Sequence, residues 1–349
     1  MNKHLAIALA LSVSAVAFSA QQPRVSDTQF STEPVGAGLS ATVTRFQHSS
    51  QQLWIGYEVP SLPRHSSSSC SDSNGSNDDG CCGEYRLEGS GNSVNGSSEN
   101  AAPGRMYVLL RLDHGAVMKV RPANAGCRLN AGGVPFTWLT GVQPEDSVHY
   151  LAQLAAQGTE NRVTEGAMAA MAMHASPAAT SELVSLATSS GTPKLREKAA
   201  FWLGAERGHE GFLALQKLVK SEQDPKLREK LAFDLSINKD PGSMDELLAL
   251  AKSDTNAGVR SQAIFWLAQK AGKKATGAIT NAIENDPDQQ VKKKAVFALS
   301  QLPKDEGVPQ LIHVAETNQN AAVRKDAFFW LGQSGDPRAL AYLESVLKR

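Results

Sequence analysis

Apolar and polar positions recur every 32 residues along the C-terminal part of the chain. Stepping forward by this period from Leu195 reaches Leu227, Val259, Val291 and Val323, each followed by Arg or Lys. A column of Ala, with Leu231 in the second copy, follows at an offset of four residues, and columns of Phe and Leu follow at offsets of six and eight, without a gap in five copies. A repeat of fixed length with helical spacing predicts paired helices that stack into a solenoid.

Each repeat is predicted to hold two helices. A short polar residue precedes each first helix and can accept a hydrogen bond from its free backbone N–H groups. The second helix carries an apolar column at the same 32-residue period, beginning at Leu183. The segment Ser147 to Gln157 aligns with a second helix, so residues 142–349 are predicted to form a half unit followed by about six hairpins. The predicted N-cap residues are Thr192, Asp224, Asn256, Asp288 and Asn320.

The aromatic columns indicate how neighbouring hairpins pack. At about 100° per residue, the Phe at offset six lies far round the first helix from the core face, so it is predicted to contact the neighbouring units. Trp occupies offset seven in alternate copies, on the core side, which favours interior packing over a binding stripe. The Phe column is Phe201, Phe233, Phe265, Phe297 and Phe329, and the Trp column is Trp202, Trp266 and Trp330, with Asp234 and Ala298 between them.

These units resemble HEAT repeats, in the short form also seen in phycobilin lyases. The segments 263–268 (AIFWLA) and 327–332 (AFFWLG) are typical of that pattern. The resemblance implies an α-solenoid, a fold that commonly binds protein partners, although a fold alone does not determine function.

Residues 21–141 show a different pattern and are predicted to form a small β-rich domain. Segments 41–46, 53–59, 106–112 and 116–120 are rich in β-branched and aromatic residues and are predicted strands. Ser, Asn and Gly dominate residues 65–104, which predicts a disordered insert. The fold class is therefore α+β multidomain, with an all-α solenoid at the C-terminal end.

The N-terminal residues and the cysteines indicate export. Residues 1–20 carry Lys3, then an apolar run shorter than a membrane span, then small residues, as in a secretory signal peptide cleaved between Ala17 and Ala20. An even number of cysteines suits disulfides in an oxidising compartment, so a periplasmic or secreted protein is expected. Adjacent Cys81 and Cys82 would form a strained bridge, which favours bonding one of them to Cys70 and the other to Cys127.

Charge limits the classes of partner. The chain has 35 basic and 35 acidic residues and a formal net charge of zero. Nucleic-acid binding needs a clustered basic face, so no nucleic acid is expected as a partner. No insertion into a membrane is expected after signal cleavage.

Motifs for chemistry are weak, and no catalytic, cofactor or metal residue is predicted. The related deoxyhypusine hydroxylase uses several His-Glu pairs to hold iron, whereas this chain has one, His209–Glu210, in an interhelical turn. Residues 72–80 resemble a calcium loop, but Asn77 stands where the turn glycine belongs. Residues 36–41 resemble a dinucleotide turn, but a strand is predicted to follow them.

We therefore expect an exported, non-enzymatic scaffold that binds another protein in a groove lined by the second helices. Two alternatives remain: a metal-dependent enzyme of a HEAT-repeat family, hydroxylase-like or lyase-like, and glycan recognition by the β domain through Trp54, Tyr57 and Trp138. The candidate groove residues are Gln216, Lys217, Lys220, Lys252, Asn281, Glu284, His313, Glu316 and Lys348.

Overall fold

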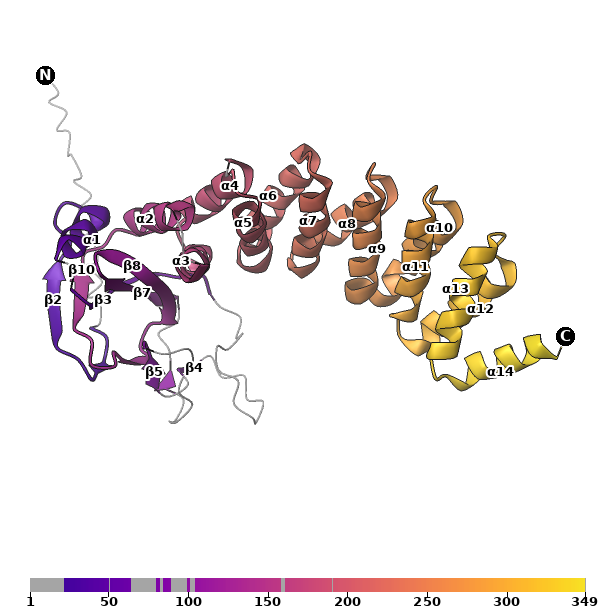
Figure 1. The fold of residues 1–349 in the computed structure, drawn as a ribbon, viewed down its shortest axis with the longest axis horizontal. Coiled ribbons are helices and arrows are strands. Elements are labelled where there is room, and N and C mark those ends of the chain that lie inside the picture. Colours follow the sequence, from indigo (N-terminus) through magenta and orange to yellow (C-terminus); the bar gives the residue numbers. More distant parts are fainter. Residues whose placement is uncertain are drawn as a thin grey trace, which may run out of the picture.

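The computed structural model combines a sheet-rich N-terminal part with an arch of paired helices (Figure 1). This confirms the predicted α+β architecture with a C-terminal solenoid. The expected signal peptide, most of the predicted insert and nearly all of the candidate calcium loop lie outside the described residues. The structure describes residues 22–49, 51–63, 80–81, 84–88, 99–100, 104–157, 161–189 and 191–348.

A five-stranded mixed sheet forms the centre of the N-terminal part, in the order β2-β10-β3-β7-β8. Strand β10 runs parallel to both β2 and β3, whereas β3, β7 and β8 form an antiparallel meander. The strands are β2 Phe30–Pro34, β10 Phe136–Thr140, β3 Leu53–Pro60, β7 Arg105–Asp113 and β8 Ala116–Asn124. A second sheet contains β1 Val25–Ser26, β9 Arg128–Asn130 and β5 Glu84–Arg86, and β4 Gly80–Cys81 pairs with β6 Glu99–Asn100.

The strand prediction was right for three segments and wrong for one. Strands β3, β7 and β8 confirm the predicted segments 53–59, 106–112 and 116–120. Segment 41–46 instead lies within helix α1, Leu39–His48. Because β2 and β3 are both parallel to β10, the chain between them must cross over, and α1 forms that crossover. Tertiary context thus outweighs the β-propensity of Thr and Val.

The central sheet is buried on both faces. One face, which includes Ile55 and Val108, packs in the same apolar cluster as the solenoid. The other face, which includes Trp54 and Trp138, packs in a separate cluster with Leu129 from the smaller sheet. Burial on both sides explains why these strands are rich in large apolar residues rather than alternating.

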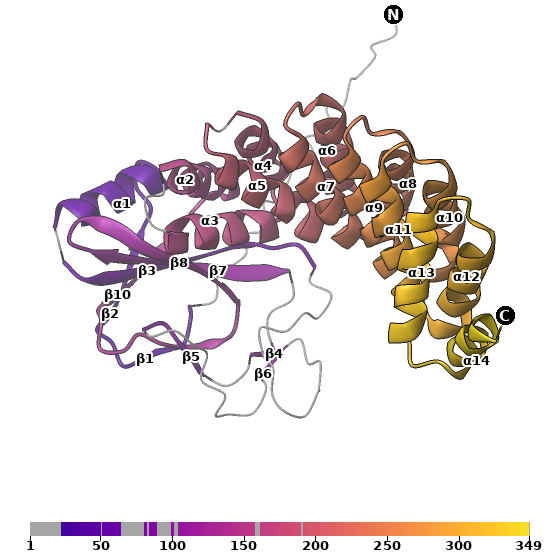
Figure 2. The same ribbon diagram turned by 45° about the vertical axis from the view of Figure 1, so that its right-hand side comes forward.

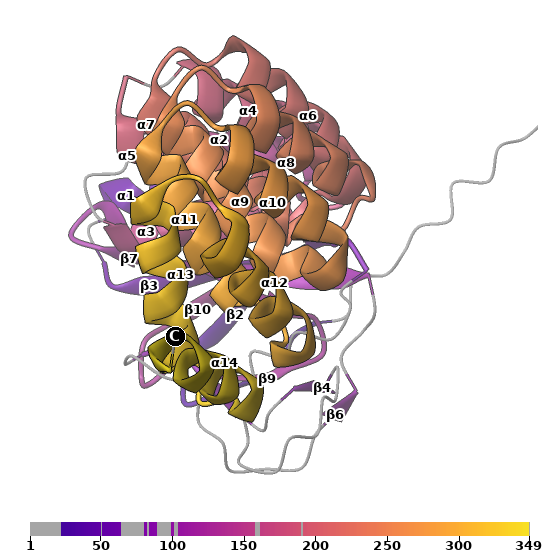
Figure 3. The same ribbon diagram turned by 90° about the vertical axis from the view of Figure 1, so that its right-hand side faces the viewer.

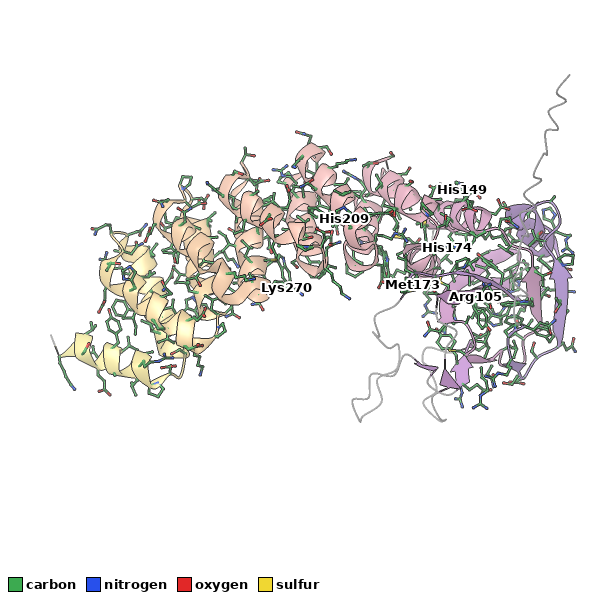
Figure 4. The ribbon with its side chains drawn as sticks, turned by 180° about the vertical axis from the view of Figure 1, so that it is seen from behind. Arg105, His149, Met173, His174, His209 and Lys270 are labelled. Carbon is green, nitrogen blue, oxygen red and sulfur yellow. The ribbon has the colours of Figure 1, made fainter. Side chains whose placement is uncertain are left out.

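Helices α2 (Pro144–Gln157) and α3 (Asn161–Met173) join the sheet to the solenoid. A Cβ on Gly166 of α3 would lie 2.0 Å from the carbonyl oxygen of Val120 on β8, so the helix lies directly against the strand. At the end of α3, near Met173 and His174 (Figure 4), the Leu62 N–H donates to the Met173 carbonyl at 2.9 Å. The sheet and the first helices therefore share one core.

Beyond the half unit α2, six helical hairpins follow in the described residues, as the sequence predicts. Asp224, Asn256, Asp288 and Asn320 accept the predicted N-cap hydrogen bonds, whereas the Thr192 side chain makes no cap hydrogen bond at the start of its helix. The first helices are α3, α5 Pro193–Glu206, α7 Pro225–Ile237, α9 Ala257–Ala271, α11 Gln289–Ser300 and α13 Ala321–Gln333. The second helices are α4 Ala178–Ser189, α6 Gly208–Ser221, α8 Gly242–Ser253, α10 Thr276–Asn285 (preceded by the 3-10 turn η1, Gly272–Ala275), α12 Lys304–Thr317 and α14 Pro337–Leu347.

The two layers of helices are packed to different extents. First helices of successive hairpins contact one another extensively, whereas successive second helices contact one another sparsely. The array therefore curves, with the first helices on the inner, concave side of the arch (Figure 2). Seen from its C-terminal end, the same array shows the first helices on one side and the second helices on the other (Figure 3).

A ladder of Arg–Asp ion pairs joins the start of a first helix to the residue that follows the second helix of the same hairpin. The Arg that follows the apolar start position reaches a carboxylate 26 residues further on: Arg228 to Asp254 at 2.9 Å and Arg260 to Asp286 at 2.7 Å. Arg260 also donates to the carbonyl of Asp254 at 2.8 Å. Burial raises the pKa of Asp286, but the hydrogen bond and charge of Arg260 outweigh burial, so that pKa lies below its ordinary value.

We predict that Arg260→Ala destabilises the array strongly. Both side chains of the pair are less than a tenth exposed, so the substitution leaves the Asp286 carboxylate buried without its partner, at a cost of about 3–5 kcal/mol. Lys348→Ala, which removes the exposed pair with Glu344, should change stability by no more than about 0.5 kcal/mol. Urea unfolding of the two variants measures the difference, and equal effects would contradict a structural role for the ladder.

Two glycines at the same repeat position should respond oppositely to alanine. A Cβ on Gly204 would lie 2.4 Å from the carbonyl oxygen of Asp234 in the next hairpin, whereas nothing lies within 4 Å of a Cβ on Gly332. Gly204→Ala should force neighbouring first helices apart and cost about 1–3 kcal/mol. Gly332→Ala should raise the free energy of unfolding by about 0.5–1 kcal/mol, because Ala has the higher helix propensity. The melting temperatures of the two variants measure the difference. If both substitutions stabilised the protein, the close approach of the helices at Gly204 would not be needed.

Candidate functional site

The concave side of the arch is formed by the first helices, which corrects the predicted groove. The candidate residues Lys217, Lys220, Lys252, Asn281, Glu284, His313 and Glu316 are exposed, but they lie on the second helices, which form the outer layer. Because the second helices are spread apart, clefts open between them. Lys217 lines a cleft of about 530 Å³ between α4 and α6, and Lys220 lies 3.8 Å from Glu246 on α8. The reason for the error is that the sequence pattern does not reveal which layer packs more tightly.

An unbroken row of eight aromatic rings runs along the first helices. We call it the aromatic ladder; in order, it contains Trp202, Phe201, Phe233, Trp266, Phe265, Phe297, Trp330 and Phe329. Successive ring centroids lie between 4.7 Å (Phe233 to Trp266) and 6.3 Å (Phe201 to Phe233) apart. The rings are partly or largely exposed, up to 56% for Phe329. The ladder therefore supports the array and also presents an aromatic surface.

The ladder alternates with a period of two hairpins. Where Asp234 or Ala298 occupies offset seven, the Phe rings of adjacent units stack directly: Phe201 on Phe233 and Phe265 on Phe297, the latter within 3° of parallel. Where Trp266 or Trp330 occupies that offset, its ring contacts the Phe of the preceding hairpin. The predicted packing of the Phe column between units is confirmed. The Trp side chains pack against the core, as predicted, but remain partly exposed.

Asp234 is a carboxyl buried beneath this ladder. It occupies the position of Trp266 and Trp330 in other units, so the repeat register directs it toward Phe201 of the preceding hairpin. Its residue is 2% exposed, and its Oδ2 has no hydrogen-bond partner among the described residues. Burial, and then the charge of Glu197 on α5, raise the pKa of Asp234 well above its ordinary value, while Lys230 opposes the shift. Sequence reasoning noted Asp234 only as an interruption of the Trp column.

The His209–Glu210 pair lies in the first turn of α6 (His209 is labelled in Figure 4) and is engaged in contacts between hairpins. The His209 ring nitrogen Nδ1 lies 2.6 Å from Asp240, and Glu210 accepts a hydrogen bond from Thr180 at 2.9 Å. The hydrogen bond with His209 lowers the pKa of Asp240. Among the residues that the structure describes, no group of three His, Cys, Asp or Glu side chains could hold a metal ion.

The predicted glycan site is wrong. Trp54, Tyr57 and Trp138 are fully buried, and the Tyr57 hydroxyl hydrogen-bonds with Ser147 at 3.1 Å. Burial accounts for this, because Tyr57 lies on the sheet face that packs in the solenoid core and the two Trp residues lie on the opposite face, under the smaller sheet.

The strand predicted after the glycine-containing segment 36–41 is wrong, because helix α1 begins at Leu39. The Asp146 carboxylate nevertheless lies 3.8 Å from where a Cβ on Gly38 would be. Its negative charge there disfavours a phosphate.

Of the four cysteines, only the Cys127 side chain lies in the described part of the chain, where it is disulfide-bonded. Its partner and the side chains of Cys70, Cys81 and Cys82 lie outside that part, so the pairing stays a prediction. None of the helices in the described residues has the length and apolar character needed to cross a bilayer.

Comparison with known families identifies the repeat. HEAT repeats match residues 180–268 and 277–349. This part of the solenoid is an array of HEAT repeats. This confirms the resemblance drawn from the aromatic and apolar columns. A search of the curated proteins found no match.

Solved structures match parts of this chain at low identity. Human deoxyhypusine hydroxylase in complex with glycerol is 18% identical, with a TM-score of 0.31, over 58% of this chain and 90% of that one. The CpcE–CpcF complex of phycocyanin lyase from Nostoc sp. PCC7120 is 21% identical, with a TM-score of 0.35, over 44% of this chain and 99% of that one. At such low identity and TM-score, these similarities carry no argument about the function of the HEAT array.

We predict that Asp234→Ala stabilises the array. Ala298 fills the equivalent position and is fully buried beneath the Phe265–Phe297 stack, so the packing does not need a carboxyl. Removing a buried polar group that lacks a hydrogen-bond partner should raise the free energy of unfolding by about 1–3 kcal/mol. Asp326→Ala, on the partly exposed surface of α13, serves as the control and should be close to neutral. Denaturant unfolding measures both, and a loss of stability in Asp234→Ala would mean that the carboxyl has a structural partner.

Proposed function

We propose that this protein is an exported, non-enzymatic scaffold whose HEAT array holds an extended segment of another protein along the aromatic ladder. The observation that carries the proposal is the ladder itself, which runs along the first helices of five successive hairpins and leaves its residues partly exposed. These helices form the concave layer of the arch (Figure 2). Aromatic side chains are enriched at the centres of protein interfaces, where they add large contact area at a small entropic cost. A row of exposed aromatic side chains on a rigid array is unfavourable in contact with water and is typical of a binding surface.

The location of the ladder also favours a long, thin occupant. Its rings follow the curve of the array from Trp202 on α5 to Phe329 on α13, so a partner that contacts all of them must extend across the hairpins. Solenoids present extended concave surfaces of this kind. The spread second helices offer separate clefts instead of a continuous surface.

Export is part of the proposal and is supported by the N-terminal sequence and by the disulfide at Cys127. The partner is therefore sought among envelope or secreted proteins. It is expected to be a protein, with no nucleic acid and no cofactor involved.

The test compares an inner-face variant with an outer-face variant. Residues 21–349 are immobilised as wild type, as Phe265→Ala/Phe329→Ala and as Lys217→Ala/Lys252→Ala, and are exposed to envelope and secreted proteins at moderate salt. We expect the wild type and the outer-face variant to retain the same proteins, identified by mass. The amount of these proteins retained by the inner-face variant should be at least tenfold lower.

Circular dichroism and unfolding of each variant serve as the folding control. Retention of no protein by the wild type, or loss caused by the outer-face substitutions alone, would overturn the proposal. Deletion of residues 21–141 is a poor substitute for these variants, because it would expose the face of α3 that packs on β8.

A further inference from the structure

Burial of the Asp234 carboxyl destabilises the fold, and no hydrogen bond to its Oδ2 from the described residues offsets that cost. A buried carboxyl without a partner is unfavourable whether it is ionised or neutral. The same repeat position holds Trp266 and Trp330, which pack on the preceding Phe, and Ala298, which lies beneath a direct Phe stack. Each of these solutions avoids the buried carboxyl. A group that destabilises its own site is a candidate for function.

The charges near Asp234 favour a cation. The residue two positions after the apolar start faces the same side of each first helix and changes from acidic to basic along the array: Glu165, Glu197 and Glu229, then Ser261, Lys293 and Lys325. Glu165 is paired with Lys198 at 2.7 Å and Glu229 with Lys226 at 3.0 Å. No ion pair joins Glu197 to another described residue, and its charge acts on Asp234. Glu197 and Asp234 are therefore two acidic groups that lack an ion pair among the described residues, on helices that also carry rings of the aromatic ladder.

We infer that Asp234, assisted by Glu197, receives an arginine or lysine side chain from the bound protein segment, whose cation stacks against Phe201 and Phe233. This inference rests on the proposed function and adds the chemistry of the partner. The Oδ2 atom without a partner would accept the charge-assisted hydrogen bond that it now lacks. The aromatic faces would add a cation–π contribution. Phe201 is 36% exposed and is the more exposed of the two rings, so the cation would approach from its side.

Binding should also depend on pH, with a definite sign. Only the ionised carboxyl of Asp234 pairs with a cation, and burial raises the pKa of this carboxyl in the free protein, which favours its protonated form. Glu197 from α5 maintains the raised pKa, and Lys230 on α7 opposes it. A basic partner should therefore bind more tightly as the pH rises through the pKa of Asp234, while its own side chain stays charged.

The test uses a random peptide library selected on immobilised wild-type protein, followed by synthesis of the best binder with arginine and with citrulline, its neutral analogue. We expect selected peptides to carry a basic residue flanked by apolar ones. Replacing arginine by citrulline should weaken binding to wild type about tenfold or more, which corresponds to loss of a hydrogen bond between charged groups. In Asp234→Asn, which keeps the shape of the side chain, the two peptides should bind equally.

Asp326→Asn is the matched control and should discriminate between the peptides as wild type does. The pH dependence should be present in wild type and absent in Asp234→Asn. The inference would be overturned if Asp234→Asn distinguished the arginine peptide from the citrulline peptide as strongly as wild type does. It would also be overturned if the selected peptides lacked a basic residue but still required Phe265 and Phe329 for binding. Neither result would contradict the proposed scaffold function. If no peptide binds along the ladder, both proposals fail.

Discussion

The structure depends on the burial of each hairpin's apolar side against its neighbours. A pair of short helices cannot cover its own core, and the repeat supplies the cover from the next pair along the chain. The N-terminal sheet plays the same role at the start of the array, because α3 lies against β8 with only a glycine, Gly166, between the two backbones. The sheet is therefore part of the solenoid's core and not a separate body on a linker.

Unequal packing of the two layers turns this stack into an arch. The first helices approach one another closely, as at Gly204, where a neighbouring carbonyl leaves no room for a Cβ. The Arg–Asp ladder fixes the spacing at the turns, with both groups largely buried and the acid's pKa lowered by its partner. The second helices spread apart on the outside. Curvature thus arises because the first helices pack more closely than the second, and it places the helices that carry the aromatic column on the inner side.

The aromatic ladder combines support for the array with the potential to bind. Its stacked Phe rings and Trp contacts join successive hairpins, so the surface offered to a partner is held in place by the packing that supports the array. Rigidity of this kind lowers the entropic cost of binding an extended segment. Asp234 interrupts the ladder with a polar group that the packing does not require, and it therefore gives one position along an otherwise repetitive surface a distinct chemistry.

The sequence by itself determined the repeat, its helices and caps, the contact of the Phe column with neighbouring units and three strands of the sheet, because these depend on local periodicity and on backbone hydrogen bonding. It could not show which layer of helices lies inside the curve, since that depends on how closely whole helices approach. For the same reason it misplaced the groove residues on the second helices. It took buried Trp54, Tyr57 and Trp138 for a surface and the crossover helix α1 for a strand, because only the tertiary structure decides what covers a segment and which strands it must connect. The isolation of Asp234 likewise follows from the side chains that surround it, and no periodicity in the sequence records that.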